Sequence, residues 1–231
     1  MIRAPLILDP HAVPVIATDA HLPGVSSAAM TPAALRERFA RPPEWAAEFL
    51  GDSLAPADSL SPAAVLVPLV MRPQGLHLLL TQRTAHLRAH AGQVSFPGGR
   101  SEAEDADATA TALREALEEI GLQTRHVEVI GVLPIYTTVT AFAVTPVVAL
   151  IEPPFDLTLD IREVATTFEV PLEFIMTPAN HRHHSVEFQG RQRRFLSMPW
   201  TETSVEGAAR EHLIWGATAA MLRNLYRLLR A

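Results

Sequence analysis

Runs of apolar and β-branched residues predict a β-sheet in this chain. The expected strands are residues 64–70, 76–82, 127–133 and 141–151, with a shorter pair at 186–188 and 194–198. The first two strands flank Pro73-Gln74-Gly75, and the shorter pair flanks Gln189-Gly190-Arg191; both tripeptides are typical of turns. The sequence therefore predicts two hairpins and two further strands.

Apolar residues at helical spacing predict helices on either side of these strands. The expected helices are residues 32–39, 44–50, 107–120, 171–176 and 212–229. The first has Thr31 as its N-cap and Pro32 at its first position, and the second ends near Gly51. The last carries an apolar stripe that would pack on a sheet, made of Ile214, Ala217, Met221, Leu225 and Leu228.

The order of these elements predicts an α/β chain. Strands before and after a central helix, with a long helix at the end, indicate a mixed sheet between helical layers. Residues 1–30 contain four prolines and no helical periodicity, so we expect an extended arm there. We expect residues 1–60 to form this arm and short helices packed on one domain of residues 61–231.

The central helix has two unlike faces. Its carboxylates share one narrow arc at about 100° per residue: Glu115, Glu118 and Glu119. Its large apolar residues fall on the opposite side: Leu113, Leu117 and Ile120. Like charges at this spacing destabilise an isolated helix, and no Lys on that face offsets them. We therefore expect the leucine side to meet the core and the glutamate side to face a cation, with a solvated acidic surface as the alternative.

Composition narrows the class of protein. With 231 residues, 48% hydrophobic and 19% charged, the chain is long and apolar enough to bury a full core, which excludes wholesale disorder. The absence of cysteine excludes disulfides, thiolate nucleophiles and Cys-zinc sites. We find no apolar stretch long enough to span a bilayer and no signal-peptide pattern, so we expect a cytoplasmic protein.

Charge is distributed unevenly along the chain. The net charge of −6 argues against general nucleic-acid binding. Residues 102–119 hold seven acidic residues and one Arg, whereas residues 83–100 hold three Arg and two His and no acidic residue. An acidic segment that can attract a cation thus adjoins a basic segment that can attract an anion. This arrangement suits a metal-bound diphosphate, because basic side chains can hold the oxygens that the ion does not reach.

The residues around the acidic helix support such a site. Phe96-Pro97-Gly98-Gly99 can form a tight turn with close backbone approach. Asp105 and Asp107 offer helix caps and negative charge for the first turn, and Gly121 offers a C-terminal stop. Carboxylate oxygens favour Mg²⁺, Mn²⁺ or Ca²⁺ over softer metals. The segment therefore predicts a hard-metal site at a glycine turn.

This segment resembles the signature of the Nudix hydrolase family, G-x5-E-x7-R-E-U-x-E-E-x-G-U, in which U is aliphatic. The matching residues are Gly99, Arg114, Glu115, Ala116, Glu118, Glu119, Gly121 and Leu122. Two departures lie in the loop: Asp105 stands where the signature has Glu, and eight residues rather than seven separate it from Arg114. The resemblance implies an α/β/α sandwich with a mixed β-sheet and a loop-helix-loop catalytic motif.

A longer segment is similar to the coenzyme A pyrophosphatase branch of that family. Residues 79–99 follow the branch pattern L-L-T-x-R-[ST]-x-x-L-R-x-H-x-G-Q-V-x-F-P-G-G, and both departures are also typical of the branch. The resemblance implies a Mg²⁺- or Mn²⁺-dependent diphosphatase that cleaves coenzyme A or acyl-coenzyme A into 3′,5′-ADP and 4′-phosphopantetheine or its acyl form. A broader nucleoside-diphosphate hydrolase acting on ADP-ribose-like substrates and a non-catalytic nucleotide sensor are the alternatives.

The resemblance also implies roles for individual residues. Glu115, Glu118 and Glu119 would form the metal shell, with Glu115 and Glu119 preferred as direct ligands, and Arg114 would support them. Glu163 is a candidate proton acceptor, because residues 163–172 are similar to an E-V-x-x-x-F-x-V-P-L stretch of the branch. A rim carboxylate or a helix cap is the structural alternative for Glu163.

Substrate contacts are expected from the segment that precedes the acidic helix. The candidate substrate-binding residues are Arg83, His90, Gln93, Gly98 and Gly99. For Arg83, His90 and Gln93 the expected ligand is the nucleotide or its 3′-phosphate, and loop bracing is the alternative. We expect a small-molecule substrate and neither a nucleic-acid nor a membrane partner; a homodimer is left open.

Overall fold

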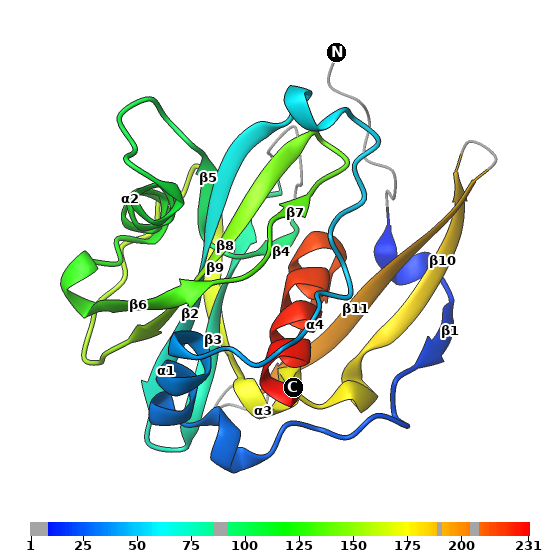
Figure 1. Cartoon of the computed structure of the whole chain (residues 1–231), viewed down its shortest axis with the longest axis horizontal. Helices are drawn as coiled ribbons and strands as arrows, with labels where there is room; N and C mark the ends of the chain where they lie inside the picture. Colours follow the sequence, from blue (N-terminus) through cyan, green and yellow to red (C-terminus); the bar gives the residue numbers. More distant parts are fainter. Residues whose placement is uncertain (1–8, 86–91, 189–190, 204–207) are drawn as a thin grey trace.

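The computed structural model describes residues 9–85, 92–188, 191–203 and 208–231. These residues form a large and a small β-sheet with four α-helices (Figure 1). The helices are α1 (Pro32–Ala40), α2 (Ala108–Ile120), α3 (Leu172–Ile175) and α4 (Gly216–Arg230). Short 3₁₀ turns lie at Pro10–Ala12, Ser27–Met30, Ala57–Ser59, Thr124–His126 and Pro178–Asn180.

The large sheet is mixed. Its strands are β2 (Ser61–Arg72), β3 (Gly75–Arg83), β4 (Val94–Ser95), β5 (Gly98–Arg100), β6 (Val127–Val132), β7 (Tyr136–Thr137), β8 (Phe142–Ile151) and β9 (Val164–Pro171). The two long central strands, β2 and β8, run parallel, whereas β3 pairs antiparallel with both β2 and β9. This arrangement confirms the predicted α/β class with a mixed sheet.

The small sheet was not expected as a separate layer. It consists of β1 (Val15–Thr18), β10 (Arg182–Phe188), β11 (Arg191–Thr203) and β12 (Ala209–Trp215), all antiparallel and in the order β1-β10-β11-β12. The strands β10 and β11 form the predicted second hairpin, although both are longer than predicted. Strand β1 belongs to the N-terminal arm and pairs with β10 at the edge of this sheet.

Alternating residues of the large sheet face two separate cores. On β2, Ala64, Leu66 and Val70 pack with Ala112, Ala116 and Ile120 of α2. Val67 and Leu69 of the same strand belong to the other core, which also contains apolar residues of α4 and of the small sheet. Figure 1 shows α2 on one side of the large sheet and α4 between the two sheets. The helical layers on both faces of the sheet are as predicted.

Two predicted helices were partly or wholly wrong. Residues 44–50 are irregular, because Asn224 of α4 supplies the partners of their main chain: its Oδ1 accepts from the N–H groups of Glu48 and Phe49, and its Nδ2 donates to the Phe49 carbonyl. Residues 212–215 belong to β12 and pair with β11, so α4 begins only at Gly216, whose φ is +61°.

The N-terminal segments are tied to α4 by a buried ionic cluster. The guanidinium of Arg223, only 3% exposed, lies 3.0 Å from Asp19 Oδ2 and 2.8 Å from Glu48 Oε2. It also lies 3.0 Å from Nδ1 of His181, whose Nε2 is 2.7 Å from the Ile175 carbonyl oxygen. Among the described residues, no helix is both long enough and apolar enough to cross a membrane.

Candidate functional site

The acidic helix α2 begins and ends where its capping residues predict. Asp107 is the N-cap and accepts a hydrogen bond from the Ala110 N–H at 2.8 Å, while Gly121 ends the helix with φ +70°. Asp105 is not a cap. Its carboxylate instead binds the side chain of Arg114 and accepts hydrogen bonds from the Glu102 N–H and the Thr111 hydroxyl.

The predicted orientation of α2 was only partly correct. Ile120 is fully buried and Leu113 packs against the same core, as predicted. Leu117 is 42% exposed, whereas Glu119, expected opposite the core, is only 5% exposed. The residues that pack against the sheet include Ala112 and Ala116, whose small side chains let the helix lie close to β2. The core face of α2 therefore extends from Leu113 and Ile120 to the two alanines, and Glu119 lies beside it in a buried position.

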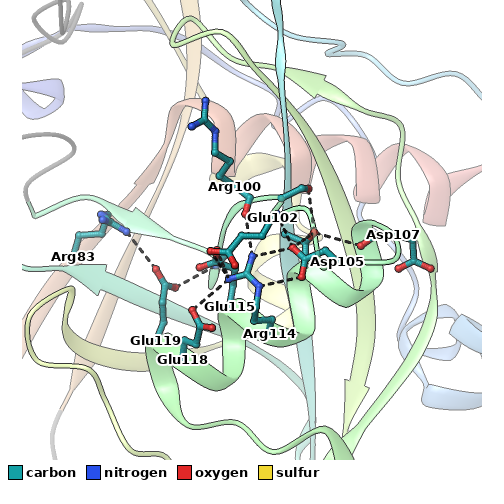
Figure 2. Close-up of polar contacts among 12 residues, drawn as sticks. Arg83, Arg100, Glu102, Asp105, Asp107, Arg114, Glu115, Glu118 and Glu119 are labelled. Carbon is teal, nitrogen blue, oxygen red and sulfur yellow. Dashed lines mark hydrogen bonds and ion pairs between the residues drawn. The ribbon is translucent and has the colours of Figure 1, made fainter.

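The side chain of Arg114 links the loop at residues 100–105 to α2. Its guanidinium binds Asp105 through two nitrogens at 3.0 and 2.9 Å and donates to the Arg100 carbonyl at 3.0 Å. The same group lies 3.0 Å from Glu115 and 3.3 Å from Glu118 (Figure 2). The bidentate contact with Arg114 holds the pKa of Asp105 well below its usual range. Asp105 was missed as a partner of Arg114, although its place in the signature was visible.

The turn at Gly98 and Gly99 approaches the carboxylates closely. Both residues lie on β5, which pairs with β2. The Gly98 N–H donates to Glu119 Oε2 at 3.2 Å, and Gly98 has a φ of +156°. A Cβ atom on Gly99 would collide with the carboxylate of Glu115, and one on Gly98 would lie 2.6 Å from Val65 Cα. Only glycine therefore allows this approach of main chain to carboxylate.

Arg83 joins two acidic segments. It is the last residue of β3, and its Nη1 lies 3.4 Å from Glu119 Oε1 while its Nη2 lies 3.5 Å from Glu163 Oε2. Glu163 is the residue before β9, and its carboxylate is half exposed. The structure thus brings Arg83, Glu119 and Glu163 together, although 80 residues separate Arg83 from Glu163 in sequence.

The positions of the other predicted site residues say less about the chemistry of the site. The main-chain carbonyl of Gln93 accepts a hydrogen bond from the Arg83 N–H at 2.9 Å. His90 lies outside the described residues. Glu118 is at the exposed rim of α2, where its carboxylate is 60% exposed and contacts Arg114. The structure therefore groups Glu115 and Glu119 with the glycine turn more closely than Glu118.

Burial makes the charged forms of the two inner carboxylates unfavourable. Burial is the largest cause that raises the pKa of Glu119, and the nearby Glu115 and Glu163 add to it, whereas the hydrogen bond from Gly98 and the charge of Arg83 oppose it; the resulting pKa is about 7. Burial also raises the pKa of Glu115, while its contact with Arg114 opposes the shift. A cation between these groups would favour their ionised forms.

The residues present fit a hard divalent cation. Glu115 and Glu119 offer carboxylate oxygens at a turn where main-chain groups come close. Within the described part of the chain, no three His, Asp or Glu side chains come close enough together to hold a metal ion unaided. A cation here would therefore take further oxygens from water or from a bound phosphate, which is how Mg²⁺ is usually held.

Known proteins are similar to this chain over more than half of its length. The NUDIX domain model matches residues 60–192. Two relatives named "Uncharacterized Nudix hydrolase NudL", from Salmonella paratyphi B and Salmonella newport, are 45% identical over 163 residues, which cover 71% of this chain and 80% of each relative.

Solved structures give weaker matches. An Ap4A hydrolase from C. elegans has 21% identity and a TM-score of 0.41, and covers 50% of this chain and 85% of its own. A MutT protein from Methanosarcina mazei Go1 has 24% identity and a TM-score of 0.40, and covers 50% of this chain and 81% of its own. The family model and the NudL relatives carry the assignment: the chain belongs to the Nudix family, whose hydrolases act on diphosphate bonds of small-molecule substrates.

Proposed function

We propose that the protein hydrolyses the diphosphate bond of coenzyme A or an acyl-coenzyme A. The products would be 3′,5′-ADP and 4′-phosphopantetheine or its acyl form. The observation that carries the proposal is the position of Arg83. It belongs to residues 79–99, which resemble the coenzyme A branch, and its guanidinium lies 3.4 Å from Glu119 of the acidic helix. The segment proposed to recognise the substrate thus adjoins the segment proposed to act on it.

Glu115 and Glu119 are the proposed ligands of Mg²⁺ or Mn²⁺, and Glu118 would act at the rim. When bound, such an ion would withdraw charge from the phosphate oxygens and lower the pKa of a coordinated water. Arg114 would keep Glu115 in place through its contact at 3.0 Å, while Asp105 keeps Arg114 in place. Gly98 and Gly99 would leave room for the diphosphate beside the two carboxylates.

Glu163 is the proposed proton acceptor. Hydrolysis forms a bond from a water oxygen to phosphorus, breaks the bond to the bridging oxygen, and releases a proton from the water. Glu163 is close enough to Glu115 and Glu119 to influence their ionisation, and its half-exposed carboxylate can pass a proton to solvent.

A substrate panel tests the proposal. The protein would be incubated with Mg²⁺ or Mn²⁺ and coenzyme A, acetyl-coenzyme A, dephospho-coenzyme A or ADP-ribose, and the products identified by mass spectrometry. We expect 3′,5′-ADP and the matching phosphopantetheine from the first two, and slower cleavage of the substrates without a 3′-phosphate. Intact coenzyme A beside efficient ADP-ribose cleavage would favour the broader hydrolase, and binding without turnover of any substrate would favour the sensor.

The acidic helix gives this panel a matched pair of variants. Glu119→Gln should lower turnover of coenzyme A by a factor on the order of 10² or more, because a proposed ligand of the ion is lost. Glu104→Gln makes the same chemical change on the exposed loop before α2 and should leave turnover unchanged. Equal rates for Glu119→Gln and the unaltered protein would remove Glu119 from the site.

A further inference from the structure

Arg83 is placed where a cation would be expected. Its guanidinium lies between two carboxylates from different segments, Glu119 on α2 and Glu163 before β9, at 3.4 and 3.5 Å. Figure 2 shows the side chain of Arg83 directed toward Glu119 from the neighbouring strand. Both distances exceed the 2.7–2.9 Å that is typical of a charge-assisted hydrogen bond. Arg83 therefore neutralises the two carboxylates without being locked to either.

Glu119 and Glu163 need such a cation. They come from different segments, and because both lie within 3.5 Å of the one guanidinium of Arg83, their charges are brought close together. Arg114 contacts Glu115, but its guanidinium is already held by Asp105 and by the Arg100 carbonyl. Arg83 is the guanidinium that contacts both Glu119 and Glu163, and its side chain is 24% exposed. It can therefore turn outward without crossing the core.

We propose that Arg83 is a positioning residue that exchanges partners when the site is loaded. This inference rests on the proposed function. Before a divalent ion binds, Arg83 neutralises Glu119 and Glu163. Once the ion supplies the counter-charge of Glu119, Arg83 turns to the phosphate oxygens of the ligand, where a guanidinium binds in a bidentate manner. Arg83 thereby makes the phosphate ligand bind better to the metal-loaded protein than to the metal-free one.

This exchange predicts two effects of opposite sign. Without nucleotide, Arg83 competes with the ion for Glu119, so its removal should strengthen metal binding. With nucleotide present, Arg83 links the two ligands, so its removal should abolish their mutual enhancement. Because coupling between two binding sites is reciprocal, the enhancement can be measured from either ligand. A residue that only braces the loop would produce neither effect.

Binding measurements with Mn²⁺ and 3′,5′-ADP test the exchange without relying on turnover. Mn²⁺ affinity would be measured at pH 8 by electron paramagnetic resonance, with and without 3′,5′-ADP. In the unaltered protein, 3′,5′-ADP should raise Mn²⁺ affinity by about 5- to 150-fold, the usual range for coupled sites. Arg83→Gln should bind Mn²⁺ more tightly than the unaltered protein when no nucleotide is present, and should show no enhancement by 3′,5′-ADP.

Two further variants sharpen the comparison. Arg100→Gln removes the same charge from β5, but the Arg100 side chain contacts Ser61 and Phe142 instead of Glu119 or Glu163, so it should behave as the unaltered protein does. Arg83→Lys restores the charge but not the planar fork that spans two carboxylates, so it should restore only part of the enhancement. Thermal unfolding of each variant verifies that it is folded.

The outcomes separate this inference from the proposed function. Unchanged enhancement in Arg83→Gln, or weaker Mn²⁺ binding by that variant without nucleotide, would overturn the exchange while leaving the metal site intact. Absence of enhancement in the unaltered protein would also overturn the exchange, and the substrate panel would still decide the function. If Glu119→Gln binds Mn²⁺ as the unaltered protein does, the metal site itself is wrong and both proposals fall.

Discussion

Glu119 shows how a single side chain can be placed at a cost to stability. It is 5% exposed, and its environment raises its pKa to about 7, so its charged form is unfavourable in the metal-free protein. The Gly98 N–H and Arg83 compensate only in part. A carboxylate with so unfavourable an ionised form is expected at a functional site rather than at an ordinary helix face.

The first prediction concerns the stability of Glu119→Gln without metal. The folded pKa of about 7 lies above the unfolded value of 4.5, so the folded state binds more protons between these values. The contribution of Glu119 to the free energy of unfolding should therefore fall as pH rises from 4.5 to 7. Removing the charge should stabilise the metal-free protein at pH 8 by at most about 3 kcal/mol. Urea unfolding at pH 5 and pH 8 measures the difference.

Glu104→Gln provides the control for that measurement, because Glu104 is exposed on the loop before α2. Its effect on the free energy of unfolding should be small at both pH values. If Glu119→Gln changed stability equally at pH 5 and pH 8, burial of an ionised Glu119 would not be the reason.

The second prediction concerns Gly99→Ala. The added methyl group would collide with the Glu115 carboxylate, which is the end of a flexible side chain and can move away. The protein should therefore remain folded, whereas Mn²⁺ affinity and turnover should each fall by a factor on the order of 10 or more, as when a metal site loses its supporting geometry. Calorimetry with Mn²⁺ and circular dichroism measure the two properties.

Gly24→Ala is the matched control, because a Cβ atom at Gly24 makes only ordinary contact, 3.7 Å from the Met176 carbonyl oxygen. A Gly99→Ala protein with full metal affinity would show that Glu115 does not need this close approach.

At the scale of whole elements, capping residues and periodic apolar runs were reliable guides. The long strands β2, β3, β6 and β8, the helices α1 and α2, and the short helix α3 all lie where local sequence predicts them. The exposure of Leu117 and the burial of Glu119 were not predictable in this way, because they depend on the close packing of Ala112 and Ala116 on β2. Tertiary contacts likewise decided residues 44–50 and 212–215.

The third prediction tests how α4 holds the irregular segment at residues 44–50. Asn224 is 1% exposed and satisfies three main-chain groups of Glu48 and Phe49. Asn224→Ala should leave these groups unpaired and lower the free energy of unfolding by about 1–3 kcal/mol. Residues 44–50 should become more susceptible to limited proteolysis, which mass spectrometry of the fragments would locate.

Gln123→Ala is a suitable control, since it removes an amide that lies exposed beside Gly121. Equal stability and equal cleavage for both variants would mean that Asn224 is not what fixes this segment.

At the scale of the molecule, the site joins parts of the chain that lie far apart in sequence. Arg83 from β3, Gly98 from β5, Glu119 from α2 and Glu163 before β9 meet at one end of the large sheet. The sequence named each of these residues through the family resemblance. It could not predict that Arg83 would contact carboxylates rather than face solvent, because that contact depends on how β3, β9 and α2 are brought together by the fold.

The small sheet is the largest feature that local sequence did not reveal as a separate layer. Its strands come from residues 15–18 and from the last quarter of the chain, so its pairing depends on contacts of long range. The cluster of Arg191, Arg193 and Arg194 at the start of β11 is also more typical of a solvated hairpin than of a packed layer. The apolar residues Leu196, Met198 and Ile214 nevertheless join the core around α4.

The central claim is that Glu115 and Glu119 hold a divalent ion against a diphosphate. It is tested most directly by anomalous diffraction from a crystal grown with Mn²⁺ and a non-cleavable coenzyme A analogue. We expect an anomalous peak within about 2.0–2.4 Å of carboxylate oxygens of both residues, with the diphosphate oxygens completing its coordination. A peak at other residues, or a diphosphate bound away from α2, would contradict the account.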